Sequence, residues 1–132
     1  MEFNWNMPKK LRPYYRQELD AYQGCLRKGE LQKAWAHLER AHILGQPYPC
    51  EHTAVHVKML RFGMHTRNGK EIMGQIPRLL VGGIKSWAGK VPVGNTGGAN
   101  VSPLKPMPIP NDLQAIIRQA NSNYQTQRYE NK

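Results

Sequence analysis

Apolar residues recur at helical spacing through the first two thirds of the chain. Pro13 is a favoured first-turn residue, and the apolar stripe after it predicts a helix that ends at Gly29. A second helix is predicted over about residues 30–44, before the stop signals Gly45 and Pro47. The two stripes comprise Tyr15, Leu19, Tyr22 and Leu26 in the first helix, and Leu31, Ala34, Trp35, Leu38, Ala41 and His42 in the second.

Two further helices are predicted over residues 51–66 and 70–88, separated by the turn signal Asn68-Gly69. Pro77 lies inside the last of them and is expected to kink or split it. Because the connections are short, consecutive helices should be antiparallel neighbours. The pattern therefore predicts an all-α fold of two antiparallel helical hairpins.

The pattern changes after residue 88, because much of the glycine and proline content lies between residues 82 and 110. Residues 89–110 are predicted to form an extended arm packed over the hairpins. Asn111 or Asp112 can cap a short last helix. The predicted organisation is a tail at 1–12, a hairpin core at 13–88, the arm at 89–110, a short helix at 111–121 and a polar tail at 122–132.

The composition fits one ordinary domain: 132 residues, 39% hydrophobic, with a mean hydropathy of −0.68. No apolar run is long enough to span a bilayer, and the first ten residues do not form a secretory signal. The two cysteines, Cys25 and Cys50, form no CxxC motif, which fits a reducing compartment. We expect a cytoplasmic protein without a membrane segment.

Three of the five histidines face the predicted core. His42 lies about 40° from the centre of the second helix's apolar stripe. On the third helix, His52 and His56 lie about 20° and 60° from the inward-facing Met59. His37 and His65 are expected at the surface.

These histidines have metal-ligand spacing and meet at one end of a hairpin. His52 and His56 are four residues apart, as in helical metal sites, and Glu39 and His42 are three apart, as in carboxylate–imidazole ligation in helical bundles. The second helix ends just after His42 and the third begins just before His52, so an antiparallel pair brings these side chains together. Cys50 and Glu51 lie at the same end.

Imidazole suits Zn, Cu, Ni or Fe, and Glu39 would then be a fourth ligand or would orient one of the histidines. Two alternatives fit the same residues. In one, the histidines are structural, and Glu39 or Glu51 hydrogen bonds to His42 and His52. In the other, they have a catalytic role without a metal. No separate acid–base pair or nucleophile accompanies the cluster, which favours binding over turnover.

Two other regions of the sequence are candidates for binding anions. The formal charge is +10, and one predicted basic face comprises Lys58, Arg61, Arg67, Lys70 and Arg78. Nucleic acid is one partner for such a face, but no helix-turn-helix, zinc finger or RNA-binding aromatic pattern accompanies it. In the arm, backbone N–H groups at Asn95, Thr96, Gly97 and Gly98 form a weaker candidate anion site, the alternative being a purely structural arm.

Three blocks resemble a small bacterial family known only as a domain of unknown function. They are residues 37–46 (HLERAHILGQ), then His52 and His56 with Met59-Leu60, and then residues 91–101 (VPVGNTGGANV) with 106–110 (PMPIP). The resemblance covers roughly residues 14–117 and implies one module, without implying any activity, substrate or cofactor.

The favoured function is therefore a small metal-binding protein for homeostasis, sensing or sequestration, with His42, His52, His56 and Glu39 as the candidate ligands. A second interpretation, from the small residues around Leu38, is a tetratricopeptide-like interaction module that binds a protein or an anionic partner. A metal-dependent hydrolase or oxygenase is a third. A two-fold homodimer that completes a half-site is also compatible with the pattern.

Overall fold

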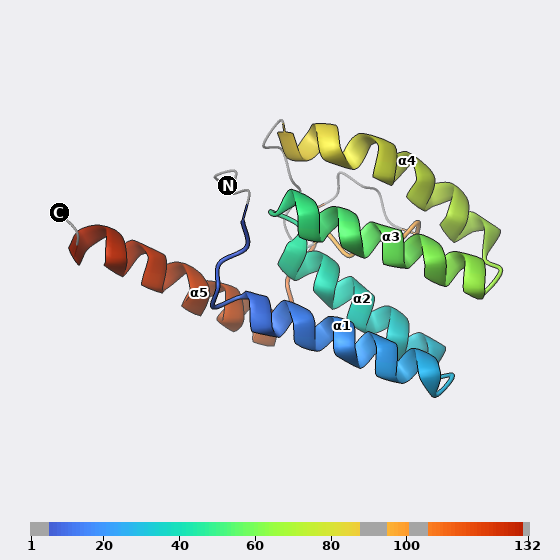
Figure 1. The fold of residues 1–132 in the computed structure, drawn as a ribbon, viewed down its shortest axis with the longest axis horizontal. Helices are drawn as coiled ribbons and strands as arrows, with labels where there is room; N and C mark the ends of the chain where they lie inside the picture. Colours follow the sequence, from blue (N-terminus) through green and yellow to red (C-terminus); the bar gives the residue numbers. More distant parts are fainter. Residues whose placement is uncertain (1–5, 88–94, 101–105, 131–132) are drawn as a thin grey trace.

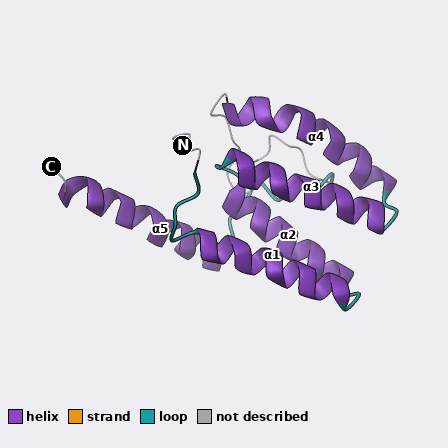
Figure 2. Ribbon diagram, viewed as in Figure 1, coloured by secondary structure: helices purple, strands orange, loops and turns teal. Residues whose placement is uncertain are grey.

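The computed structural model describes residues 6–87, 95–100 and 106–130, and all regular structure within these ranges is α-helical (Figures 1 and 2). The helices are α1 (Arg12–Arg27), α2 (Leu31–Gly45), α3 (Pro49–His65), α4 (Gly69–Trp87) and α5 (Asn111–Glu130). The predicted all-α class is confirmed, and the first four helices lie within a few residues of their predicted positions.

The first four helices form two antiparallel hairpins side by side. Helix α1 packs against α2, α3 against α4, and α2 joins the hairpins by packing against α3. Figure 1 shows α5 beginning beside the start of α1 and then extending away from the four helices, and α5 also packs against α2. The α2–α3 junction is the short connection between Gly45 and Pro49, so the end of α2 and the start of α3 lie together.

Both hairpins turn through the same hydrogen-bond pattern with different residues. After α1, the N–H of Glu30 donates to Cys25 O at 2.9 Å, and Gly29 takes the left-handed conformation with φ +73°. After α3, the N–H of Asn68 donates to Gly63 O at 2.8 Å, and the left-handed residue is Arg67 with φ 53°. The second turn therefore holds a residue with a Cβ in a conformation that favours glycine.

The core begins as an apolar cluster and becomes polar toward α4. Its apolar part includes Leu38, Ala41, Val55 and Met59, each 0% exposed. Buried polar residues adjoin this cluster, namely His42, Gln46, His56, Glu71, Gln75 and Asn95. Buried polar groups require hydrogen-bond partners, so these side chains identify the region where a functional site is to be sought.

Two predicted helix boundaries differ from the structure. Helix α4 is not split at Pro77 but runs unbroken from Gly69 to Trp87, with Pro77 exposed. Helix α5 continues past residue 121 to Glu130, because residues 122–130 contain no glycine or proline. Of the predicted arm, residues 95–100 and 106–110 are described without helix or strand, and the rest lies outside the described ranges.

No helix in the part of the chain that the structure describes is long and apolar enough to cross a membrane.

Candidate metal centre

Three histidines converge on one point, as their helical positions predict. The Nε2 atoms of His42, His52 and His56 form a triangle in which each pair is 3.0 Å apart. The rings meet edge to face, with centroids 4.6–4.8 Å apart. His42 and His56 are 2% and 4% exposed, and His52 is partly buried. These three residues, here called the histidine triad, bring α2 and α3 together at their shared end.

A backbone carbonyl orients His42. Its Nδ1 lies 2.6 Å from Asn95 O, and since a carbonyl only accepts, Nδ1–H donates. The neutral ring therefore presents a lone pair at Nε2. Gly97 lies against this ring, where a Cβ would be 2.5 Å from His42 Cδ2. A residue without a side chain is needed for the loop to approach so closely.

A buried amide orients His56. Gln75 Oε1 lies 2.6 Å from His56 Nδ1. The opposite end of the amide is fixed, because Gln75 Nε2 donates to Glu71 Oε1 at 2.6 Å and to Gly97 O at 2.9 Å. Gln75 Oε1 must therefore accept from His56 Nδ1–H, and Nε2 of His56 also presents a lone pair.

Hydrogen bonds among the three rings cannot satisfy all three Nε2 atoms of the triad. With the protons of His42 and His56 on Nδ1, their Nε2 atoms face each other at 3.0 Å with no hydrogen between them. His52 can donate from Nε2 to one of them, but the repulsion between the other two lone pairs remains. A cation between the three nitrogens would satisfy all the lone pairs together.

Protonation of the imidazoles does not remove the repulsion between the Nε2 lone pairs at neutral pH. Burial and the neighbouring rings lower the pKa of His42 well below its ordinary value, and burial lowers the pKa of His52 to about 3. Burial also lowers the pKa of His56 to about 4, against the opposing effect of Gln75. All three rings are therefore neutral near pH 7, which is the form that binds metals.

The triangle has the right size for a first-row transition metal. An ion about 2.0–2.1 Å from each nitrogen would sit about 1 Å out of their plane. A regular tetrahedral site would need the nitrogens about 3.3–3.4 Å apart, so a slight opening of the triangle suffices. The triad can thus hold a metal ion, with at least one coordination position left for another ligand.

The other candidate ligands lie elsewhere. Among the described residues, the convergent group contains only the three histidines. Glu39 is half-buried beside Thr96, and burial raises the pKa of its carboxyl group against the opposing effect of Thr96. Cys50 is exposed, and Glu51 Oε2 is buried with no partner in the described ranges. Nδ1 of His42 bonds to Asn95 O, and Nδ1 of His52 has no partner in the described ranges, so the carboxylate pairs of the structural alternative are not formed at these atoms.

The loop 95–100 uses backbone amides that sequence analysis considered for an outside anion. The N–H of Gly97 donates to Asn95 Oδ1 at 2.9 Å. The N–H of Ala99 donates to both oxygens of Glu71, at 3.1 Å each. The carboxylate of Glu71 is thus bound by the N–H of Ala99, which follows the four residues of the predicted anion site.

The predicted basic face is only partly a surface feature. Arg61, Arg67 and Lys70 are exposed and Lys58 is half-buried. The half-buried Arg78 turns back along α4, and its Nη1 donates to Gly74 O at 3.1 Å. The charge of Arg78 contributes to the low pKa of both His42 and His56, so this arginine belongs electrostatically to the histidine triad.

Sequence analysis missed Gln75 and Glu71, which hold His56 and the loop 95–100. With the histidine triad they form what we call the polar centre. The available signal was their spacing: Glu71, Gln75 and Arg78 lie on one face of α4 at steps of four and three. Without knowing that this face packs on α3, such a stripe is typical of a solvated helix surface.

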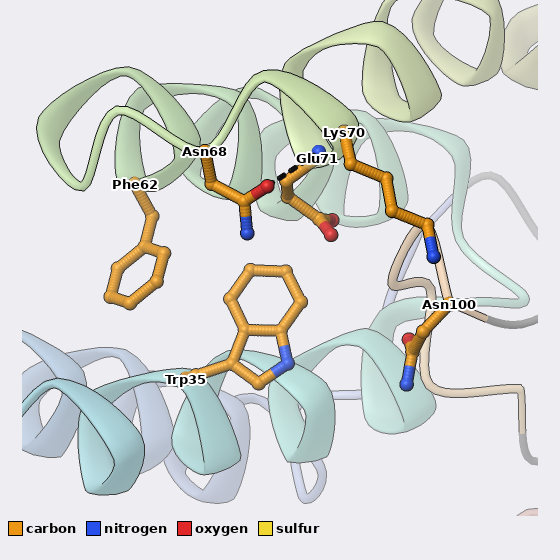
Figure 3. A pocket seen from close by; sticks show the side chains of 6 residues that line it. All are labelled: Trp35, Phe62, Asn68, Lys70, Glu71 and Asn100. Atoms are coloured by element: carbon orange, nitrogen blue, oxygen red, sulfur yellow. Dashed lines mark hydrogen bonds between the residues drawn. The ribbon is translucent and has the colours of Figure 1, made fainter.

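A pocket of about 270 Å³ lies beside the polar centre, between α2, α3 and the start of α4. Figure 3 shows its lining, in which Asn68 Oδ1 caps α4 by accepting from the N–H of Glu71 at 3.2 Å. The rings of Trp35 and Phe62 form one wall, with centroids 5.2 Å apart. Glu71 is the residue shared by this pocket and the polar centre.

Comparison with known proteins identifies the module. Residues 9–117 match the family described as "Protein of unknown function (DUF3703)", and the chain belongs to that family. No curated protein and no solved structure matches the chain. The family resemblance of the sequence blocks is confirmed, and the family description carries no activity with it.

Proposed function

We propose that this member of the DUF3703 family binds one divalent transition-metal ion through Nε2 of His42, His52 and His56. One observation carries the proposal: the oxygens that fix Nδ1 of His42 and His56 leave two lone pairs 3.0 Å apart in a buried site. A metal ion turns this repulsion into coordination.

The ligand set also indicates which ions are suitable. It offers imidazole nitrogens without a thiolate or carboxylate in the convergent group of described residues. Such a set suits Zn, Cu, Ni, Co or Fe and disfavours Mg and Ca, which prefer oxygen ligands. The proposed role is binding for homeostasis, sensing or sequestration, because the sequence pattern indicates no nucleophile or separate acid–base pair beside the triad.

Elemental analysis of protein purified without an affinity tag tests this function. We expect about one transition-metal ion per chain after loading with Zn and dialysis, and less than about a tenth of that in His52→Ala and in His56→Ala. His65→Ala is the matched control, because it removes an exposed histidine from the far end of the same helix.

Circular dichroism checks that each variant is folded. The proposal fails if the wild-type protein retains none of Zn, Cu, Ni or Co, or if folded His52→Ala retains as much as the wild type.

A further inference from the structure

The pocket beside the polar centre has the features of a second binding site. Its volume of about 270 Å³ is just below the range of about 300–1,000 Å³ that is typical of pockets for drug-sized ligands, so its ligand must be small. Helices α2 and α3, the start of α4 and the loop 95–100 each contribute to the lining. The lining side chains are Trp35, Phe62, Asn68, Lys70, Glu71 and Asn100.

One end of the pocket is aromatic. The rings of Trp35 and Phe62 have centroids 5.2 Å apart and an interplanar angle of 42°. Both side chains are partly buried and pack against the apolar core, so this wall is in place before a ligand binds. A flat apolar ring would bury its surface here and make aromatic contacts with both residues.

The other end of the pocket is polar and rich in hydrogen-bond donors. Figure 3 shows the ammonium group of Lys70 and the amide of Asn100 at the end away from Phe62. The indole nitrogen of Trp35 lies on the same side of its ring. No hydrogen bond or ion pair of the described residues uses these three donors. Gly98 lets the loop reach this end, because a Cβ there would lie 3.1 Å from Trp35 Cζ2.

The two charged groups of the lining differ in what a ligand can reach. The carboxylate of Glu71 is already bound, because it accepts from Gln75 Nε2 at 2.6 Å and from the N–H of Ala99 at 3.1 Å. Glu71 is also only 8% exposed. Lys70 is exposed and forms no ion pair within the described ranges. The accessible charge of the pocket is therefore positive, in a chain whose formal charge is +10.

From this arrangement we infer that the pocket binds a small aromatic anion, with its ring against Trp35 and Phe62 and its carboxylate or other singly charged oxyanion at Lys70. Asn100 and the indole N–H would donate to the same oxyanion. One ammonium group balances one negative charge, so a phosphate group with nearly two charges is matched less well. This second site does not depend on metal binding by the histidine triad.

Isothermal titration calorimetry at pH 7 with three probes of similar size tests the inference. The probes are benzoate, neutral benzamide and cationic benzylamine. We expect the wild type to bind benzoate with a Kd of about 1 mM or lower, and the other two at least about threefold more weakly. Lys70→Gln should raise the benzoate Kd about threefold to fivefold and leave the benzamide Kd unchanged. Phe62→Leu should raise both Kd values about threefold or more.

Lys10→Gln is the matched control, since it removes the same charge from an exposed lysine outside the lining, and its benzoate Kd should equal that of the wild type. A benzoate Kd well above about 1 mM overturns the inference, as does binding of benzamide or benzylamine that is as tight as that of benzoate. Equal benzoate Kd values in the wild type and Lys70→Gln also overturn it. If Phe62→Leu does not fold by circular dichroism, the exposed substitution Lys70→Gln decides. The titrations use protein treated with a chelator, so their outcome is separate from that of the zinc-binding test.

Discussion

The apolar cluster and the polar centre lie next to each other, yet their buried side chains are stabilised by different interactions. The cluster, around Leu38, Ala41 and Met59, buries side chains that need only close packing. The polar centre buries imidazoles, an amide and a carboxylate, each of which must find a partner. Among the described residues, its unsatisfied atoms are found at the triad, where the three Nε2 atoms meet and where His52 Nδ1 is buried without a partner.

The two regions therefore differ in what stabilises them. The apolar cluster stabilises the hairpins whether or not a cation is present. On the proposed function, the polar centre adds little stability by itself and would be stabilised when a cation binds. Substitutions in the two regions should therefore differ in whether their effect depends on metal.

The largest expected effect is in the apolar cluster. Leu38→Ala removes a side chain that is 0% exposed, and we expect the free energy of unfolding to fall by about 2–5 kcal/mol. Urea unfolding with and without zinc measures this, and the loss should be the same in both. Metal stoichiometry of the folded variant should match the wild type. A loss that appears only with zinc would contradict the separation of the two regions.

The next effect lies in the polar centre. Gln75→Leu leaves His56 Nδ1–H, Gly97 O and Glu71 Oε1 without the amide that now contacts all three. We expect zinc affinity to fall about 10–100-fold and the metal-free protein to lose about 1–3 kcal/mol of unfolding free energy. Competition with a chelator measures the affinity.

Gln32→Leu is the control for this substitution, because Gln32 is exposed on α2. Equal zinc affinity in Gln75→Leu and Gln32→Leu would show that the orientation of His56 does not matter for binding.

Lowering the pH should destabilise the folded protein through the histidines of the polar centre rather than through the apolar cluster. The folded-state pKa values of His52 and His56, about 3 and about 4, lie below the unfolded value near 6.5, and that of His42 is also lowered. Below pH 6.5 the unfolded chain binds protons that the folded chain does not, so stability falls as the pH is lowered toward 4.

Each histidine contributes a slope of at most about 1.4 kcal/mol per pH unit. Urea unfolding of metal-free protein between pH 7 and pH 4 measures the total, and His52→Gln should have a shallower dependence than the wild type. A pH dependence that is identical in His52→Gln would mean that this ring is protonated as readily in the folded protein as in the unfolded one.

The same contrast explains what the sequence could predict. Helical periodicity placed His42, His52 and His56 on inward faces, and helix ends joined by a short connection placed them together. It could not identify their partners. Asn95 contributes a backbone carbonyl, which no side-chain pattern reveals, and Gln75 is recognisable only once α4 is known to pack on α3.

The predicted ligand Glu39 illustrates the limit of spacing arguments. The Glu-x-x-His step fixes which turn of α2 carries the carboxylate, but the contact with Thr96 depends on the path of the loop 95–100, which lies more than fifty residues away in the sequence. Long-range packing thus decides between a ligand and a neighbour.

The smallest expected effect is on the free energy of unfolding and comes from the turn after α3, which lies outside both regions. Arg67 has φ 53° where the equivalent residue of the first hairpin is Gly29. Arg67→Gly should raise the free energy of unfolding by about 0.5–1 kcal/mol, since glycine adopts this conformation without a steric penalty. Arg67→Ala removes the same charge and keeps the Cβ, so it should bring no gain. Urea unfolding measures both variants, and zinc affinity should be unchanged in each because the turn lies at the opposite end of α3 from His52. An equal gain in both variants would assign the effect to the lost charge, and a change in zinc affinity would mean that the turn and the polar centre are coupled through α3.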